Sequence, residues 1–180
     1  IIAKIAQYGV IVAAMVIFAE TGLLFGFFLP GDSLLVSIGL FANPNMERHI
    51  PGLNIVTVNI VLVVAAFLGD QTGFLLGSKV SDKIWHWKDG RLYKRKHMEE
   101  AHEFYLKHGG LAIIGAHFIP VMRTFVPFAA GVAKMPYRKF LMWDLVGAPV
   151  WITSLLWLGY FVGNTPLGKH VESVILLVVV

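Results

Sequence analysis

The chain contains no cysteine and few charged residues. Without cysteine, disulfides and thiolate metal sites are excluded. Charged residues make up 14% of the 180 residues, whereas soluble domains contain about 25%. Hydrophobic residues make up 57% and the mean hydropathy is +0.71. These values together indicate a protein that folds in lipid, and they argue against a soluble enzyme or a nucleic-acid binder.

Several familiar signatures are also missing. The sequence has no Gly-x-Ser-x-Gly, no Gly-x-Gly-Asp and no paired Ser-Arg…His…Asp phosphatase pattern, so we expect no enzymatic activity. His97 and His102 are five residues apart rather than four, so we expect no metal site, and no cofactor is indicated. The first 30 residues lack the features of a removable signal peptide. The chain starts at Ile1 without methionine and ends in a valine run, which predicts a longer natural protein.

Apolar stretches dominate what is present. A membrane-spanning helix needs roughly 20 apolar residues. The sequence therefore predicts a single all-α integral membrane domain over residues 1–180. Its apolar stretches are residues 5–28, 33–42, 55–78, 111–133 and 140–163, followed by a truncated final helix at 171–180.

Basic residues gather in two of the connections. Residues 79–108 hold eight Lys or Arg and residues 134–139 hold three, whereas 43–56 and 164–170 hold one each. The positive-inside rule places the first two connections in the cytoplasm and the other two outside. The net charge of +4 is then explained by membrane orientation rather than by nucleic-acid binding. Within the first connection, residues 97–107 show the periodicity of an interfacial cytoplasmic helix.

This orientation puts both ends of residues 111–133 on one side of the membrane. A single span cannot do this, so the segment must fold back, and Pro120 lies where the fold is needed. Its halves, 111–119 and 124–133, each reach roughly 15 Å, about half the hydrocarbon core. The sequence therefore predicts a re-entrant helical hairpin.

A second break of the same kind lies near the N-terminus, at Pro30 and Gly31. Phe28-Leu29-Pro30 resembles Phe118-Ile119-Pro120, and a GxxxG pattern follows each, at Gly73 to Gly77 and at Gly159 to Gly163. These echoes predict an inverted repeat with two opposed re-entrant hairpins, typical of transporters whose substrate site lies at the midplane. Repeat 1 covers about 5–80, the cytoplasmic loop and surface helix 81–110, and repeat 2 about 111–164. The GxxxG glycines suit internal packing or a homo-oligomer equally.

Ionisable residues inside apolar segments are costly and usually functional. Arg123 follows the break at Pro120, and its guanidinium together with a helix N-terminus favours a phosphate. The alternative is a structural partner for an internal carboxylate. Glu20 suits reversible proton binding, or else reaches water at the interface. Asp32 is expected to cap the helix that follows it, with a substrate or coupling role as well.

Three further residues remain as candidates. His117 precedes the second break and is suited to relay protons, although a single buried histidine is often only hydrogen-bonded. Asp70 and Asp144 each lie alone in an apolar stretch and serve either function or helix packing. We selected Glu20, Asp32, His117, Arg123 and Asp70 as the substrate or coupling set. The hairpin breaks are Pro30, Gly31 and Pro120.

The chain resembles the DedA family of bacterial membrane proteins, also described by the VTT or SNARE-associated domain. The resemblance covers nearly the whole chain and is carried by Glu20, the segments 28–33, 69–77 and 118–123, and positions from Ala130 to Trp151. It implies opposed re-entrant hairpins, lipid transport, and key roles for Glu20, Asp32 and Arg123. The chain departs from the family pattern at His117, where many members carry Arg, and at Phe74 and Asp144, where Tyr and Asn are common.

Together these observations predict a flippase in the bacterial inner membrane. The family resemblance implies that its substrate is a lipid-linked phosphate, either a carrier lipid of the undecaprenyl phosphate type or a phospholipid, and that the proton-motive force drives the transport. Its expected partners are that lipid, membrane lipids, and protons or another coupling cation. The alternative is a proton-coupled cation or drug antiporter for membrane homeostasis, with Arg123 as a structural counter-ion. An intramembrane enzyme and an assembly scaffold are the remaining classes.

Overall fold

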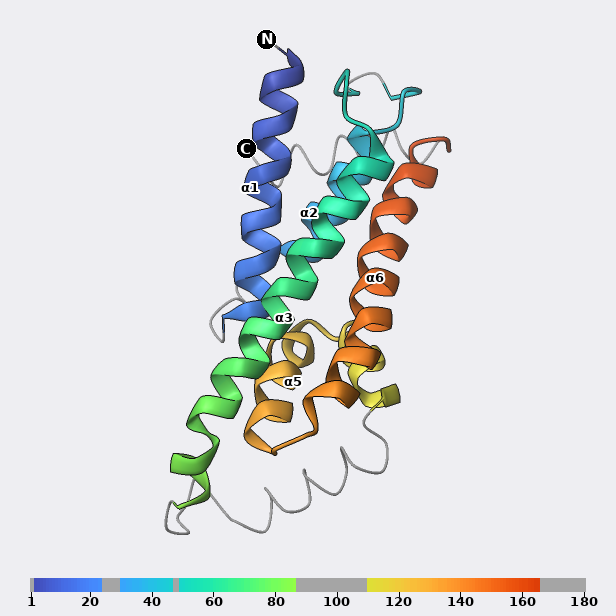
Figure 1. Ribbon diagram of the computed structural model, residues 1–180. Helices are drawn as coiled ribbons and strands as arrows, with labels where there is room; N and C mark the ends of the chain where they lie inside the picture. The colour runs from blue at the N-terminus through green and yellow to red at the C-terminus, as the bar shows by residue number, and fades with distance from the viewer. Residues whose placement is uncertain (1, 24–29, 47–48, 87–109, 166–180) are drawn as a thin grey trace. The chain divides into compact units, whose positions relative to one another are not determined.

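The computed structural model describes residues 2–23, 30–46, 49–86 and 110–165, and every regular element in these ranges is a helix (Figure 1). The all-α prediction is therefore confirmed for this part of the chain. The predicted surface helix at 97–107 and the final helix at 171–180 lie outside the described residues. Residues 110–116 are also helical. The remaining helices are α1 (Ile2–Gly22), α2 (Gly31–Phe41), α3 (Ile55–Trp85), α5 (Pro120–Val132) and α6 (Tyr137–Val162).

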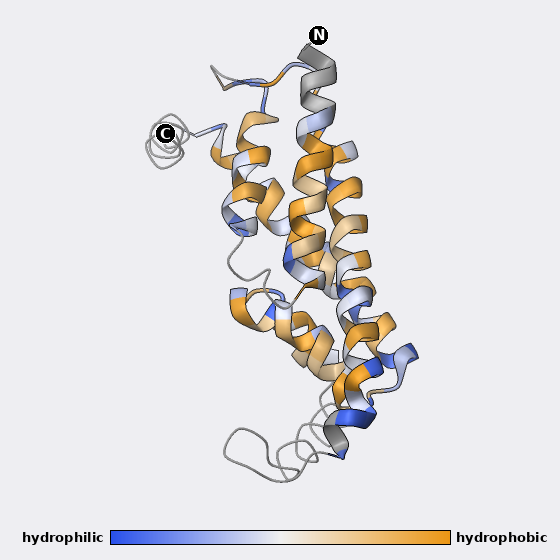
Figure 2. Cartoon of the chain, turned by 90° about the vertical axis from the view of Figure 1, so that its left-hand side faces the viewer, coloured by the Kyte–Doolittle hydropathy of each residue, from blue (hydrophilic) through white to orange (hydrophobic). Residues whose placement is uncertain are grey.

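Two helices are long and apolar enough to cross a membrane by length and composition: Ile55–Lys83 within α3, and α6. Colouring by hydropathy shows hydrophobic residues along much of the length of the helices (Figure 2). The helix α3 continues to Trp85, seven residues beyond the predicted apolar stretch. The last two turns of α3 are polar, but they contain no proline and no glycine after Gly77. Because residues such as lysine are good helix formers, the helix continues through them.

The chain divides into two compact units, each assembled from distant segments. Unit 1 comprises Ile1–Ile17, Pro30–Ala65 and Val150–Val180, and unit 2 comprises Phe18–Leu29 and Ala66–Pro149. Each unit thus draws on both of the predicted repeats.

In unit 1, the backbones of α2 and α6 approach each other very closely. A Cβ atom at Gly39 would overlap the carbonyl oxygen of Leu156, and one at Gly159 would overlap that of Val36. Only glycine allows two helix backbones to approach so closely. Leu35 and Leu40 on α2 and Leu156 on α6 are fully buried.

Unit 2 contains a crossing of the same design between α5 and α3. A Cβ at Gly77 would overlap the carbonyl oxygen of Phe128, and one at Gly131 would overlap that of Phe74. The ring of Phe74 stacks on Phe140, with centroids 4.5 Å apart, in the core of this unit. Gly77 and Gly159 belong to the two predicted GxxxG patterns, so these patterns serve packing within the chain.

The helix α5 ends in a Schellman motif that uses lysine rather than glycine. Lys134 has a φ of 57°, its N–H donates to Gly131 O at 3.1 Å, and the N–H of Met135 donates to Ala130 O at 3.0 Å. The side chain of Lys134 then forms an ion pair with Asp82 at 2.7 Å. This contact joins the two basic connections that the charge pattern places on one side of the membrane.

The two connections predicted to lie on the other side also meet, in unit 1. Asn45 Nδ2 donates to Asn164 Oδ1 at 2.8 Å, and Asn43 Nδ2 donates to the same oxygen at 2.9 Å and to Tyr160 O at 2.6 Å. Asn43 is fully buried. The connections that the positive-inside rule places on the same side of the membrane are thus the ones that contact each other. Which side each pair faces stays a prediction.

Candidate functional site

The predicted break within residues 111–133 is present. The helical residues 110–116 end in a turn at 117–119, and α5 begins at Pro120 (Figure 1). Proline suits the first position of a helix because it has no N–H to leave unsatisfied and its φ is already helical. Ile119, at the N-cap position, is extended with φ −112° and ψ 110°. The turn places His117 before the break and Arg123 in the first turn of α5.

Arg123 forms a buried ion pair with Glu20, which lies near the end of α1 in unit 2. The two residues are 3% and 0% exposed. The end of α1 is fixed on α3 by Thr21, whose hydroxyl donates to Ala66 O at 3.1 Å. Two of the predicted site residues are therefore brought together, and Arg123 has an internal carboxylate as partner.

A second buried cluster in unit 2 contains His117, Asp70, Asp144 and Gln71. The Nε2 atom of His117 lies 3.2 Å from Asp70 Oδ2 and 3.6 Å from Asp144 Oδ1. Gln71 Nε2 donates to Asp144 Oδ2 at 2.6 Å. None of the four side chains is more than 8% exposed. The ligand atoms of the histidine and the two aspartates lie within 4.8 Å of one another, which is close enough to share a cation.

The orientation of the His117 ring is set by the backbone. Its Nδ1 atom lies 2.8 Å from the carbonyl oxygen of Ile113. Because a carbonyl oxygen only accepts hydrogen bonds, Nδ1 carries the proton of that contact. The Nε2 atom therefore faces the two carboxylates.

Asp32 belongs to unit 1, and its predicted capping role is wrong. The N-cap position of α2 is Pro30, which makes no side-chain capping hydrogen bond, and Gly31 is the first helical residue. Asp32 lies inside the first turn, where its negative charge still favours the helix N-terminus. Its Oδ1 accepts a hydrogen bond from the indole Nε1 of Trp151 at 3.0 Å.

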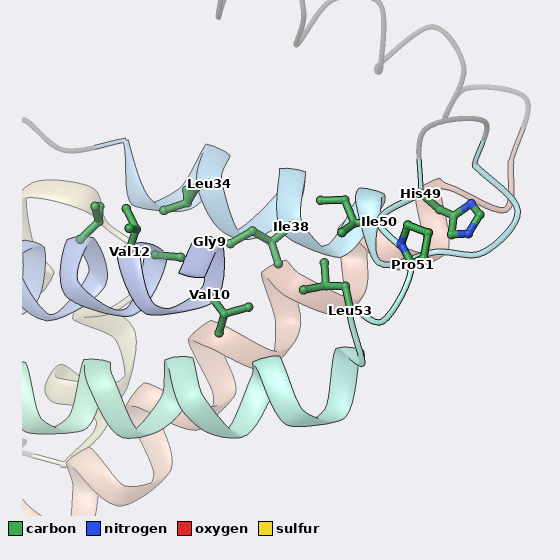
Figure 3. A pocket seen from close by; sticks show the side chains of 11 residues that line it. Gly9, Val10, Val12, Leu34, Ile38, His49, Ile50, Pro51 and Leu53 are labelled. Atoms are coloured by element: carbon green, nitrogen blue, oxygen red, sulfur yellow. The ribbon is translucent and has the colours of Figure 1, made fainter. Parts of the chain in front are cut away.

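Unit 1 also contains an apolar cavity of about 660 Å³. Its walls come from α1, α2 and the connection that follows α2 (Figure 3). Val10, Leu34, Ile38 and Leu53 are among its aliphatic lining residues, and His49 lies at one end. The lining suits a hydrocarbon chain better than a polar solute.

Among the described residues, the sequence singled out each buried ionisable side chain, but not their grouping: Glu20, Asp70, His117, Arg123 and Asp144. Gln71 was missed, although two adjacent polar residues in an apolar helix are a detectable signal. Asp144 is a candidate outside the selected set, and the structure places it beside His117. Trp151 had no assigned contact before the structure placed it beside Asp32.

Comparison with known proteins identifies the family. The VTT domain family matches residues 29–161. Protein DedA of Escherichia coli K12 is 37% identical over 166 residues, which cover 91% of this chain and 74% of that protein. An uncharacterised membrane protein of Mycobacterium leprae is 39% identical over 163 residues, or 90% and 70% of the two chains.

A more distant relative carries a location in its name. Inner membrane protein YqjA of Escherichia coli K12 is 30% identical over 161 residues, covering 88% of this chain and 70% of that protein. No solved structure matches the chain. From the domain match and the identities, the chain belongs to the VTT domain family and is a DedA-family membrane protein.

Proposed function

We propose that this protein transports a lipid-linked phosphate across the bacterial inner membrane and that protons drive the transport. The observation that carries the proposal is Arg123, a permanent cation that is 3% exposed within the first turn of a short helix that follows a break. A guanidinium matches a phosphate in a bidentate geometry. The N–H groups in the first turn of α5 add a second attraction for an anion.

The ion pair supplies a means of coupling. Glu20 and a phosphate would compete for the same guanidinium, because both are oxyanions. A proton on Glu20 would weaken the ion pair and leave Arg123 for the head group. Proton binding and phosphate binding would then favour one another, which is how a proton gradient drives a substrate.

The apolar part of the substrate has a separate requirement. Only the head group needs a polar path, since an isoprenoid or acyl tail stays in an apolar environment throughout. The aliphatic cavity beside α2 offers such an environment within the protein. Asp32, in the first turn of α2, would be a second proton or cation site in the cycle, in line with the selection made from the sequence.

A transport assay in proteoliposomes tests the central step. A fluorescent polyprenyl phosphate is distributed in both leaflets, and a membrane-impermeant quencher reports how much reaches the outer one. We expect a pH gradient to speed this movement for the unaltered protein. Arg123→Ala should abolish it, and Glu20→Gln should make it independent of the gradient.

Arg138→Gln is the matched control, because it also removes one arginine but from an exposed position. It should transport at the normal rate. Transport by Arg123→Ala at the rate of this control would contradict the proposal.

One observation favours a different function. Because Arg123 already has Glu20 as a partner, it suits a structural counter-ion in a proton-coupled antiporter of cations or amphiphilic drugs. A binding measurement distinguishes lipid transport from antiport. Polyprenyl phosphate that binds the detergent-solubilised protein, and is lost in Arg123→Ala but not in Arg138→Gln, supports lipid transport. Proton release on adding a cationic drug, with no phosphate binding, supports the antiporter.

A further inference from the structure

The buried cluster around His117 has no part in the proposed transport cycle, yet it gathers two carboxylates and an imidazole away from solvent. We propose that His117, Asp70 and Asp144 bind a divalent first-row transition-metal ion, such as Zn²⁺ or Mn²⁺. This inference does not depend on lipid transport, because it concerns different residues and is tested by metal content.

The histidine is oriented as a ligand. Its Nδ1–H donates to Ile113 O at 2.8 Å, and metal-binding histidines are commonly held by a hydrogen bond of this kind from the other ring nitrogen. The neutral ring then carries its lone pair on Nε2, which faces the oxygens of Asp70 and Asp144. Either a second ring proton or a metal ion at this position would balance the two carboxylates, and metal content distinguishes the two.

The distances fit a shared ion. Zn–N and Zn–O bonds of about 2.0–2.2 Å in a tetrahedral site separate neighbouring ligand atoms by about 3.3 Å. The two distances from His117 Nε2 are 3.2 Å to Asp70 and 3.6 Å to Asp144. The longer one exceeds an ordinary hydrogen bond of about 2.7–3.2 Å. Asp144 is therefore better placed to share a metal ion than to accept a proton from the ring.

The oxygens of the two aspartates point to the same conclusion. Asp70 Oδ1 and Asp144 Oδ1 are buried and have no hydrogen-bond partner among the described residues. Such atoms are costly unless something binds them. Gln71 holds the other oxygen of Asp144 at 2.6 Å, which leaves Oδ1 on the side of His117. Two carboxylates carry two negative charges, and one divalent cation balances both.

The ligand types restrict the metal. Imidazole with carboxylates suits Zn²⁺, Mn²⁺ or Fe²⁺, whereas Mg²⁺ and Ca²⁺ prefer oxygen ligands alone. The expectation of no metal considered only the spacing of histidines along the sequence. His117 and Asp70 are 47 residues apart and meet only in the folded chain.

Metal content provides the test. The purified protein is stripped with a chelator, incubated with Zn²⁺ or Mn²⁺, desalted and analysed by mass spectrometry for bound metal. We expect about one ion per chain, as for other dedicated sites. Asp144→Asn and His117→Arg should each lower the affinity by at least about tenfold. In His117→Arg a permanent cation replaces the ion between the carboxylates, so this variant should fold without metal.

Asp82→Asn is the matched control for Asp144→Asn, since it makes the same exchange at an exposed position, on the helix α3 that carries Asp70. It should retain the ion. X-ray absorption of the zinc-loaded unaltered protein adds a measurement that needs no variant, and it should show nitrogen and oxygen ligands that include one imidazole. An unaltered protein that retains neither metal would overturn the proposal. Equal retention by Asp144→Asn, or a spectrum without imidazole, would do the same.

Discussion

Glu20 and Arg123 form a buried ion pair although 103 residues separate them in the sequence. Each charge would be expensive to bury alone, and each is tolerated because the other balances it. The pair joins the end of α1 to the first turn of α5. The ion pair therefore links the N-terminal apolar stretch to the segment that follows the break at Pro120.

The pair makes a prediction about stability. Removing one partner leaves the other as an uncompensated buried charge, which costs about 3–5 kcal/mol. Glu20→Gln and Arg123→Gln should each destabilise the protein by this order. The double variant should lose much less than the sum, because it leaves no buried charge. Unfolding in mixed micelles with increasing SDS measures all three.

The exposed pair of Asp82 and Lys134 is the control for that experiment. Its side chains are 80% and 53% exposed, and exposed ion pairs contribute about 0–1 kcal/mol. Asp82→Asn should therefore change stability little. Additive losses in the Glu20 and Arg123 double variant would mean that the two charges do not stabilise one another.

The helix crossings predict that glycines differ sharply in their tolerance of one methyl group. Gly39→Ala and Gly131→Ala should each prevent a close crossing, because the new Cβ would overlap a backbone oxygen that cannot move alone. At Gly9 and Gly115, nothing lies within 4 Å of the position that an added methyl group would take. Alanine there should be neutral, or stabilising by up to about 1 kcal/mol from helix propensity.

Thermal unfolding in detergent distinguishes the two groups of glycine variants. We expect the crossing variants to unfold at lower temperature than the unaltered protein, and the variants at Gly9 and Gly115 to match or exceed it. Equal behaviour of the two groups would show that the crossings are looser than the structure indicates.

The hydrogen bond between Trp151 and Asp32 is also open to measurement. Trp151→Phe keeps an aromatic ring but removes the donor, and a bond to a charged acceptor contributes about 1.5–3 kcal/mol. Asp32→Ala should cost a similar amount, and the double variant little more than either. Trp143→Phe is the control, because Trp143 is an exposed residue of the same helix, α6. If Trp151→Phe is as stable as this control, the bond contributes nothing.

The elements of the fold were largely predictable, because they depend on local features of the sequence. Long apolar stretches gave α3 and α6, and proline marked the break before α5. The helix α3 extends past the apolar stretch that ends at residue 78, since hydropathy falls at Lys79 while helix propensity does not. The apolar pattern indicates which residues suit a lipid environment, and it does not show where the backbone hydrogen bonds of the helix end.

The groupings within the site were much less predictable. Asp32 followed a turn sequence that is typical of a cap, but Pro30 takes the cap position and Asp32 contacts Trp151 instead. Nothing in the spacing of Asp70 and Asp144 indicated that both would face His117. Contacts between residues so far apart depend on which helix faces meet, and nearly uniform apolar helices leave that open.

The side of the membrane on which each connection lies is a further prediction. It can be tested by cysteine labelling, because the chain has no cysteine of its own. Single cysteines at Lys83, Lys139, Asn45 and Asn164 all fall on exposed positions. The contacts of Asp82 with Lys134 and of Asn45 with Asn164 require each pair of connections to share a side. The excess of lysine and arginine places the first pair in the cytoplasm.

A membrane-impermeant maleimide reads this arrangement directly. In intact cells with a permeabilised outer membrane, Asn45→Cys and Asn164→Cys should be labelled, while Lys83→Cys and Lys139→Cys should react only in inverted vesicles. Because the chain has no cysteine of its own, any label reports the introduced position. Labelling of Lys83→Cys and Lys139→Cys from opposite sides would rule out the fold-back of residues 111–133. Labelling of both from outside would keep the fold-back but reverse the orientation, since the hairpin requires only that its two ends share one side.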